Sequence, residues 1–161
     1  MPYHNTLEEE ATYVANLGST AAKDKFHALY GGILTTWFPA SEGYIIDPQG
    51  RNGVGKFVVR QAGGHRNPLL IVELKRPAKW NDAGKQEVVQ DLTRHIEGQL
   101  DLTQNNTIYG VGGIGLHWMV CKMEKSGLHV LGTVLGWDDD ISSNQSYDAF
   151  KTVAELVYHI D

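Results

Sequence analysis

The chain has 161 residues, of which 42% are hydrophobic and 20% are charged, and its formal net charge is −5. This composition is ordinary for a globular protein, and we expect one domain over residues 1–161. The acidic balance excludes a protein that coats nucleic acid through its bulk charge, so that such contacts must come from a local basic patch. Cys121 is the only cysteine, which excludes an intrachain disulfide and a thiolate zinc cluster.

Two further patterns concern the environment of the protein. The N-terminus lacks the apolar core of a signal peptide, and no window reaches the ~18 apolar residues of a membrane helix. We therefore expect an intracellular protein, in the cytoplasm or the nucleus, that has no membrane partner. Cys121 lies in an apolar run, residues 116–121, which favours a buried structural thiol over a nucleophile.

The hydrophobic pattern predicts helices and strands in a definite order along the chain. Helices are expected at residues 5–17, about 20–37, 82–100 and 147–160, and strands at residues 44–46, 57–59, 69–74, 108–123 and 129–135, with glycine-rich turns at residues 47–55 and 63–68. Residues 69–74 form a continuous β-favouring run, which is typical of a central strand covered on both faces. The order ααβββαββα predicts an α/β (α+β) fold, with one mixed sheet and helices packed on it.

Glu73 and Lys75 carry the clearest chemical signal, because they end the predicted central strand. Side chains two residues apart in a strand point to the same face, so the carboxylate and the ammonium lie side by side. A carboxylate can bind Mg²⁺, and the metal can lower the pKa of a bound water. The lysine can orient that water or hold a phosphate oxygen. The alternative is a solvated Glu–Lys pair at a strand end.

Several stretches resemble the PD-(D/E)XK nuclease superfamily, and their amino-acid sequences resemble those of fungal PD-(D/E)XK-like domains. The matching stretches are residues 33–39 (ILTTWFP), 43–49 (GYIIDPQ), 71–77 (IVELKRP) and 109–115 (YGVGGIG). The resemblance implies a restriction-endonuclease-like core, αβββαβ, with the catalytic E-x-K on its third strand. It also implies hydrolysis of phosphodiester bonds in DNA or RNA with Mg²⁺, or Mn²⁺, as the cofactor.

Such a nuclease site needs a second acidic ligand, which the family places at the start of the second strand. Lys56 stands at that position in this chain and would repel Mg²⁺ and favour phosphate. Asp47 is the candidate for the missing ligand, provided that the turn after it folds back toward Glu73. The composition around Asp47 equally favours a simple turn residue.

Other residues are candidates for supporting roles around the predicted site. Gln90, or Gln86, on the following helix resembles the glutamine that some families place near E-x-K, although a solvated helix face explains either residue equally well. Glu8, Glu9 or Glu10 could supply a further acid, but helix capping accounts for them better. A basic cluster with one interleaved aromatic could contact phosphates and stack on a base, or could be an ordinary solvated loop. Its members are Arg76, Lys79, Trp80 and Lys85, beside Lys75.

The glycines of residues 110–115 formally satisfy G-x-G-x-x-G, but a β-like stretch follows them where a dinucleotide site needs a helix. We expect them to allow a bulge or close helix–strand packing instead. Asp138, Asp139 and Asp140 lack the spacing of a calcium loop and are expected in a turn.

Three functions are consistent with these patterns. The first is a metal-dependent nuclease in which Glu73 and Asp47 hold Mg²⁺ and Lys75 positions the water, with Gln90 nearby. The second is an inactive module of the same fold that binds nucleic acid, through Lys56, Arg76, Lys79 and Lys85, or a protein partner. The third is a structural domain that forms an oligomer such as a homodimer. The net charge and Lys56 favour the second function, whereas the E-x-K pair favours the first.

Overall fold

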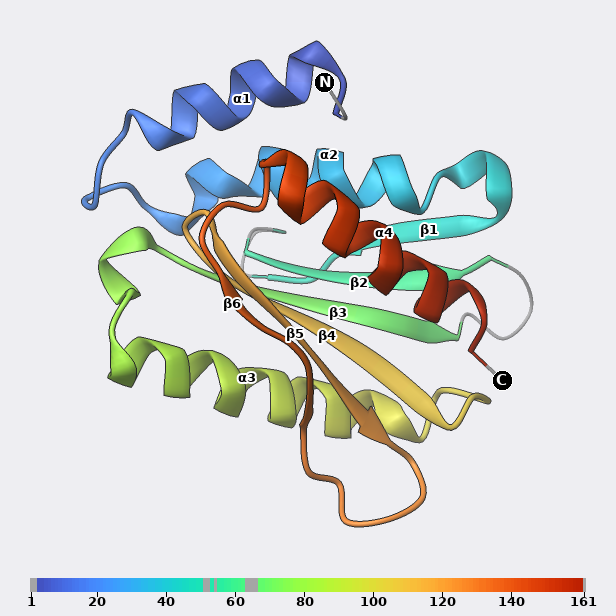
Figure 1. Ribbon diagram of the computed structural model, residues 1–161. Coiled ribbons are helices and arrows are strands. Elements are labelled where there is room, and N and C mark those ends of the chain that lie inside the picture. The colour runs from blue at the N-terminus through green and yellow to red at the C-terminus, as the bar shows by residue number, and fades with distance from the viewer. Residues whose placement is uncertain (1–2, 51–52, 54, 63–66, 161) are drawn as a thin grey trace.

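A mixed sheet of six strands forms the centre of the molecule, with helices on both of its faces (Figure 1). This computed structural model describes residues 3–50, 53, 55–62 and 67–160. The helices are α1 (Asn5–Ala15), α2 (His27–Trp37), α3 (Asp82–Leu100) and α4 (Asn144–Tyr158), with 3₁₀ turns η1 (Lys23–Phe26), η2 (Ala40–Glu42) and η4 (Pro77–Lys79). The strands are β1 (Tyr44–Pro48), β2 (Lys56–Gln61), β3 (Pro68–Lys75), β4 (Thr107–Ile114), β5 (His117–Glu124) and β6 (Gly132–Asp138). Within this described part, no helix has the length and apolar character needed to cross a membrane.

The strands lie in the sheet in chain order, from β1 to β6, and only β3 and β4 are parallel neighbours. A parallel pair needs a crossover connection, and α3 provides it. Helices α1, α2 and α4 cover one face of the sheet, while α3 covers the other (Figure 1). The prediction of one mixed sheet flanked by helices is therefore confirmed.

Helix α3 begins where its sequence favours a helix start. The side chain of Asn81 accepts a hydrogen bond from the Gly84 N–H at 2.8 Å and so caps the first turn. Its apolar residues at four-residue spacing are buried against the sheet: Val88, Leu92, Ile96 and Leu100.

The glycines of β4 allow α3 to approach the sheet closely. A Cβ atom added at Gly112 would lie 2.4 Å from Val88 Cγ1 of α3, and one at Gly110 would lie 3.1 Å from Ile96 Cδ1 of the same helix. The prediction that these glycines serve close helix–strand packing is confirmed, as is the burial of Cys121, which is 1% exposed. Burial raises the pKa of the Cys121 thiol to about 12.

The prediction of one long strand over residues 108–123 is wrong. That segment forms two antiparallel strands, β4 and β5, joined at Gly115 and Leu116. Gly115 has a φ of +60°, which a glycine adopts without strain, and the chain reverses there. The sheet consequently has one strand more than the order ααβββαββα implies. The second predicted helix is also shorter, because η1 replaces its first turns; residues 63–66 of the predicted second turn lie outside the described part.

Candidate functional site

Glu73 lies near the end of β3, on the face of the sheet that α3 covers, and is only 1% exposed. Its carboxylate has two partners from different elements. His95 on α3 donates from Nδ1 to Oε1 at 3.0 Å. Lys56 on β2 places Nζ 3.4 Å from the same oxygen. A buried carboxylate is stable only when it is paired and hydrogen-bonded, and these two side chains provide both conditions.

Lys56 is aligned with Glu73 by the sheet itself. The two residues are direct partners in the antiparallel register of β2 and β3, so their side chains project to the same face from adjacent strands. Lysine therefore occupies the position beside Glu73 from which a second carboxylate would share a metal ion.

Lys75 lies two residues beyond Glu73 and is bound to a residue of α3. Its Nζ is 2.6 Å from Asp91 Oδ2, and Arg94 Nη1 lies 3.6 Å from the other oxygen of that carboxylate. Partial burial raises the pKa of Asp91, but the hydrogen bond and charge of Lys75, with Lys56 and Arg94, outweigh burial and hold this pKa below its ordinary value. We call the group Lys56, Glu73, Lys75, Asp91, Arg94 and His95 the Glu73 cluster.

Asp47 is not brought to Glu73. It is paired with Val58 in the β1–β2 register, so it lies two strands from β3, about 9.5 Å across the sheet by ordinary strand spacing. Its carboxylate accepts a hydrogen bond from Gln49 Nε2 at 2.7 Å and lies 3.6 Å from Arg60 Nε. Asp47 thus pairs with a residue that follows β1 and with one of β2, and its partner Gln49 lines a hollow beside the Glu73 cluster.

The glutamines proposed for the site lie on the solvent side of α3, where both Gln86 and Gln90 are exposed. The helix presents Asp91 and His95 to the strands instead. These two residues are four positions apart, beside the buried stripe of Val88, Leu92 and Ile96, and they were missed in the sequence. Polar side chains at i and i+4 next to an apolar stripe are the signal that could have identified them.

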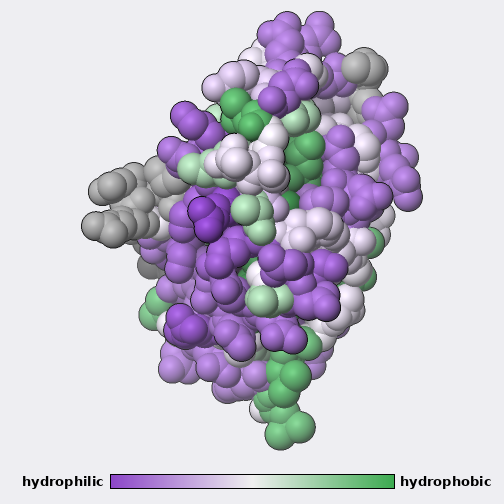
Figure 2. Space-filling model, turned by 90° about the vertical axis from the view of Figure 1, so that its left-hand side faces the viewer, coloured by the Kyte–Doolittle hydropathy of each residue, from purple (hydrophilic) through white to green (hydrophobic). Residues whose placement is uncertain are grey.

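The remaining basic residues follow β3. Arg76 is exposed, and Lys79 lies 3.4 Å from Glu87. Trp80 stacks on His117 with ring centroids 3.6 Å apart and planes within 4°, while Lys85 Nζ lies 4.1 Å from the Trp80 ring centroid. Figure 2 views this end of the molecule and shows a largely hydrophilic surface with smaller hydrophobic areas.

The donor set of the Glu73 cluster fits Mg²⁺ poorly. Hard cations take several carboxylate or carbonyl oxygens, yet a lysine accompanies each of the two carboxylates here. Across the described ranges, no group of three His, Cys, Asp or Glu side chains is placed to hold a metal ion. The cluster instead borders a hollow of about 250 Å³, lined by Gln49, Lys56, Asp91, Arg94 and His95.

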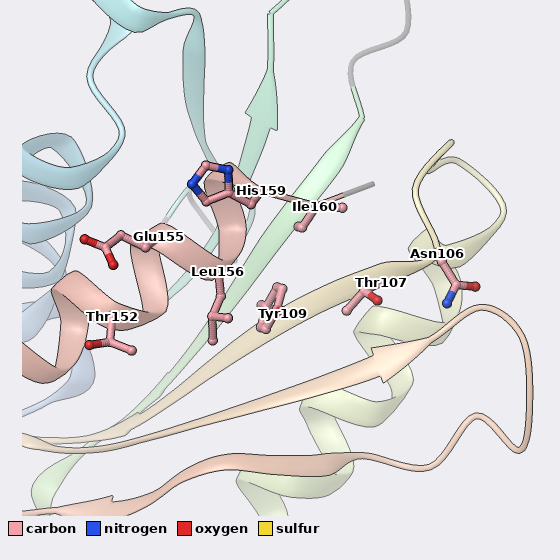
Figure 3. A pocket seen from close by; sticks show the side chains of 8 residues that line it. All are labelled: Asn106, Thr107, Tyr109, Thr152, Glu155, Leu156, His159 and Ile160. Carbon is pink, nitrogen blue, oxygen red and sulfur yellow. The ribbon is translucent and has the colours of Figure 1, made fainter.

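A larger hollow, of about 540 Å³, lies on the opposite face of the sheet between α4 and β4. Figure 3 shows Leu156 and Tyr109 pointing toward each other there, while Glu155 and His159 point away from Tyr109. Its polar side chains therefore do not converge on one point, and it offers no comparable chemistry.

Comparisons with known proteins do not indicate a function for this chain. No protein-family model, no curated protein and no solved structure matches this chain. The side chains of the Glu73 cluster are therefore the basis for the function proposed below.

Proposed function

We propose that this protein is a PD-(D/E)XK-like module that has lost metal-dependent cleavage and binds the phosphate groups of nucleic acid at the Glu73 cluster. One observation carries the proposal: Lys56 is the direct strand partner of Glu73, and its Nζ lies 3.4 Å from the buried carboxylate. The relationship to the superfamily is supported by the E-x-K pair at the end of the third strand and by the parallel crossover that follows it.

The charge of the cluster suits an anion. Lys56, Lys75 and Arg94 bring three positive charges against the two carboxylates of Glu73 and Asp91. Because the pKa of Asp91 is lowered, this carboxylate stays ionised at neutral pH and keeps Lys75 in place. The net positive charge lies around a hollow on a chain that is acidic as a whole, which is the local patch that phosphate binding requires.

The cations differ in how readily they can meet a phosphate. The side chains of Arg94 and Lys56 are 79% and 39% exposed, so both can turn toward a ligand. Lys75 is 21% exposed and anchored by Asp91. Arg94 can bind a phosphate through two parallel N–H groups, while Lys56 acts as a point charge. Glu73 serves as the buried anchor that positions Lys56 and His95.

A metal-dependent nuclease is the second candidate, and one observation favours it. Glu73 and Lys75 share the face of β3 on which α3 adds Asp91 and His95, so acidic and imidazole donors do gather at one place. For Mg²⁺ to bind, Lys56 would have to leave Glu73 and Lys75 would have to leave Asp91. The bound metal would supply an activated water, and Glu73 and Asp91 would be the residues to hold it.

Fluorescence anisotropy with labelled single- and double-stranded DNA and RNA tests the first candidate. We expect binding in EDTA that weakens with salt, because each phosphate that the protein neutralises releases counterions. Each such phosphate contributes about −0.7 to −0.9 to the slope of log K against log salt concentration. Lys56→Ala and Arg94→Ala should each weaken binding and make this slope shallower by about the amount that one phosphate contact contributes. Lys151→Ala removes an exposed lysine of α4, on the other face, and is the matched control.

The same oligonucleotides, incubated with Mg²⁺, Mn²⁺ or EDTA, separate the two candidates. Intact substrate under all three conditions, with binding that depends on Lys56, supports the binding module. Cleavage that needs metal and is lost in Glu73→Ala and Lys75→Ala supports the nuclease and overturns the first proposal. Equal binding by wild type and Lys56→Ala would also overturn it.

A further inference from the structure

A second hollow, of about 330 Å³, lies at the end of the sheet next to the Glu73 cluster. Its walls come from segments far apart in the chain: the end of α1 and the loop after it, η1, η4, the β4–β5 turn and the residue after β6. The lining side chains are mostly apolar, among them Val14, Phe26, Pro77, Ile114 and Leu116. The cluster and the hollow are linked by the sheet register, because Lys75 pairs with Ile114 and Ile114 pairs with His117.

The wall formed by the β4–β5 turn is held in place. Tyr30 on α2 is buried and donates a hydrogen bond from its hydroxyl to the Gly115 carbonyl at 2.8 Å. Pro77 packs against the same glycine, since a Cβ added at Gly115 would lie 3.1 Å from Pro77 Cγ. A hollow with fixed walls suits a rigid ligand, because little conformational freedom is lost on binding.

One polar atom on this wall lacks a partner. His117 Nδ1 is buried and makes no hydrogen bond with any described residue. Asp139 Oδ1 lies 3.7 Å from this nitrogen, beyond hydrogen-bonding distance. Burial lowers the pKa of His117 and outweighs the charge of Asp139, the backbone of Asp138 and the charge of Asp140, which raise it, so the imidazole is neutral at pH 7. In the tautomer with its proton on Nε2, Nδ1 is a hydrogen-bond acceptor.

The side chains around His117 limit the chemical class of ligand that fits this hollow. The parallel, stacked rings of Trp80 and His117 both line the hollow and make this part of it aromatic, which suits a flat ring. Asp139, whose side chain is 96% exposed, makes the rim acidic and so disfavours a phosphate in this hollow. The hollow therefore suits a neutral heteroaromatic ring that presents an N–H to His117, and a nucleobase has these properties.

We infer that this hollow takes an unpaired nucleobase from a strand whose phosphates lie at the Glu73 cluster. The inference rests on the proposed function, because it assigns the base of the same ligand. The base enters between α1 and η4, and its amino or imino N–H donates to His117 Nδ1. Binding is thus expected to favour single strands over duplexes, since a paired base cannot enter.

Free nucleosides test this inference separately from phosphate binding. An NMR titration with guanosine, adenosine, cytidine and uridine should shift the indole signal of Trp80. His117→Phe keeps a ring against Trp80 but removes the acceptor, and should weaken the bound nucleoside roughly fivefold. Ala15→Trp fills the hollow from an exposed position of α1, whereas Tyr13→Trp adds the same side chain on that helix outside the hollow.

The inference is supported when a nucleoside binds to wild type, Tyr13→Trp and Lys56→Ala, but weakly to His117→Phe and Ala15→Trp. It is overturned when no nucleoside binds, or when neither His117→Phe nor Ala15→Trp changes the affinity. Oligonucleotide binding that depends on Lys56, without nucleoside binding, overturns this inference and leaves the proposed function standing. Nucleoside binding without oligonucleotide binding supports the base site and overturns the phosphate site.

Discussion

Removal of Lys56 should reveal how strongly it compensates the buried carboxylate of Glu73. Loss of one partner of a fully buried pair costs about 3–5 kcal/mol, whereas an exposed pair contributes about 0–1 kcal/mol. Glu73 is 1% exposed but Lys56 is 39% exposed, and His95 still donates to the carboxylate. We therefore expect Lys56→Ala to lower the free energy of unfolding by roughly 1–2 kcal/mol, between these limits.

A double-mutant cycle isolates this interaction. In a Glu73→Gln background the carboxylate charge is absent, so Lys56→Ala should then cost less than about 0.5 kcal/mol. Equilibrium unfolding in urea, followed by circular dichroism, measures all four proteins. An equal cost of Lys56→Ala in both backgrounds would show that Lys56 does not compensate Glu73, and would refute the reasoning.

Three further predictions follow from the packing and the pKa shifts. Gly112→Ala should lower the free energy of unfolding by about 1–3 kcal/mol, because its Cβ would meet Val88 at 2.4 Å. Gly98 has open space around it, so Gly98→Ala should be neutral or stabilising in the same denaturant assay. The folded state holds the pKa of His117 below its unfolded value, so the stability from its neutral form is present above about pH 6.5 and is lost as pH falls below it. His117→Phe should therefore lose less stability than wild type between pH 7.5 and pH 5.5 in thermal unfolding, and an equal loss would contradict the assignment. Cys121, whose pKa is raised to about 12, should resist alkylation at pH 8 until the chain is unfolded. A thiol-labelling time course followed by mass spectrometry measures this resistance, and rapid labelling of the native protein would contradict the burial of Cys121.

Local patterns predicted the elements that carry the site. The apolar run before Glu73 indicated the central strand, and the four-residue spacing of Val88 to Leu100 indicated α3. The period of a strand also placed Glu73 and Lys75 on one face, and the structure confirms this because both reach residues of α3. These features depend on neighbours in sequence, which is why a single chain is enough to predict them.

The partners of Glu73 and Lys75 depend on long-range geometry. His95 and Asp91 reach the strand only because α3 crosses the sheet at one particular rotation, which Gly110 and Gly112 of a later strand help to set. The spacing within α3 places Asp91 and His95 beside the buried stripe, but it does not identify the strand residues that they meet. The contact between Lys56 and Glu73 likewise needs the β2–β3 register, although the motif alone had suggested that lysine stands at the acidic position.

The β4–β5 turn was missed for a local reason. A short hairpin loop is usually recognised by Asn-Gly or Asp-Gly, whereas here Gly115 follows three other glycines and precedes Leu116. The glycine-rich start of the segment masked the one glycine that reverses the chain. The turn leads into β5, whose first residue, His117, stacks on Trp80 in the proposed base site.

The central claim is that Lys56 makes this site bind phosphate instead of a metal ion. The most direct measurement compares oligonucleotide binding by wild type and Lys56→Asp in EDTA and in Mg²⁺, with cleavage followed in the same samples. We expect wild type to bind in EDTA, without any requirement for Mg²⁺, and to leave the strand intact when Mg²⁺ is present. Lys56→Asp should bind at least about tenfold more weakly than wild type in EDTA. Cleavage by wild type that requires Mg²⁺, or unchanged binding by Lys56→Asp in EDTA, would contradict the claim.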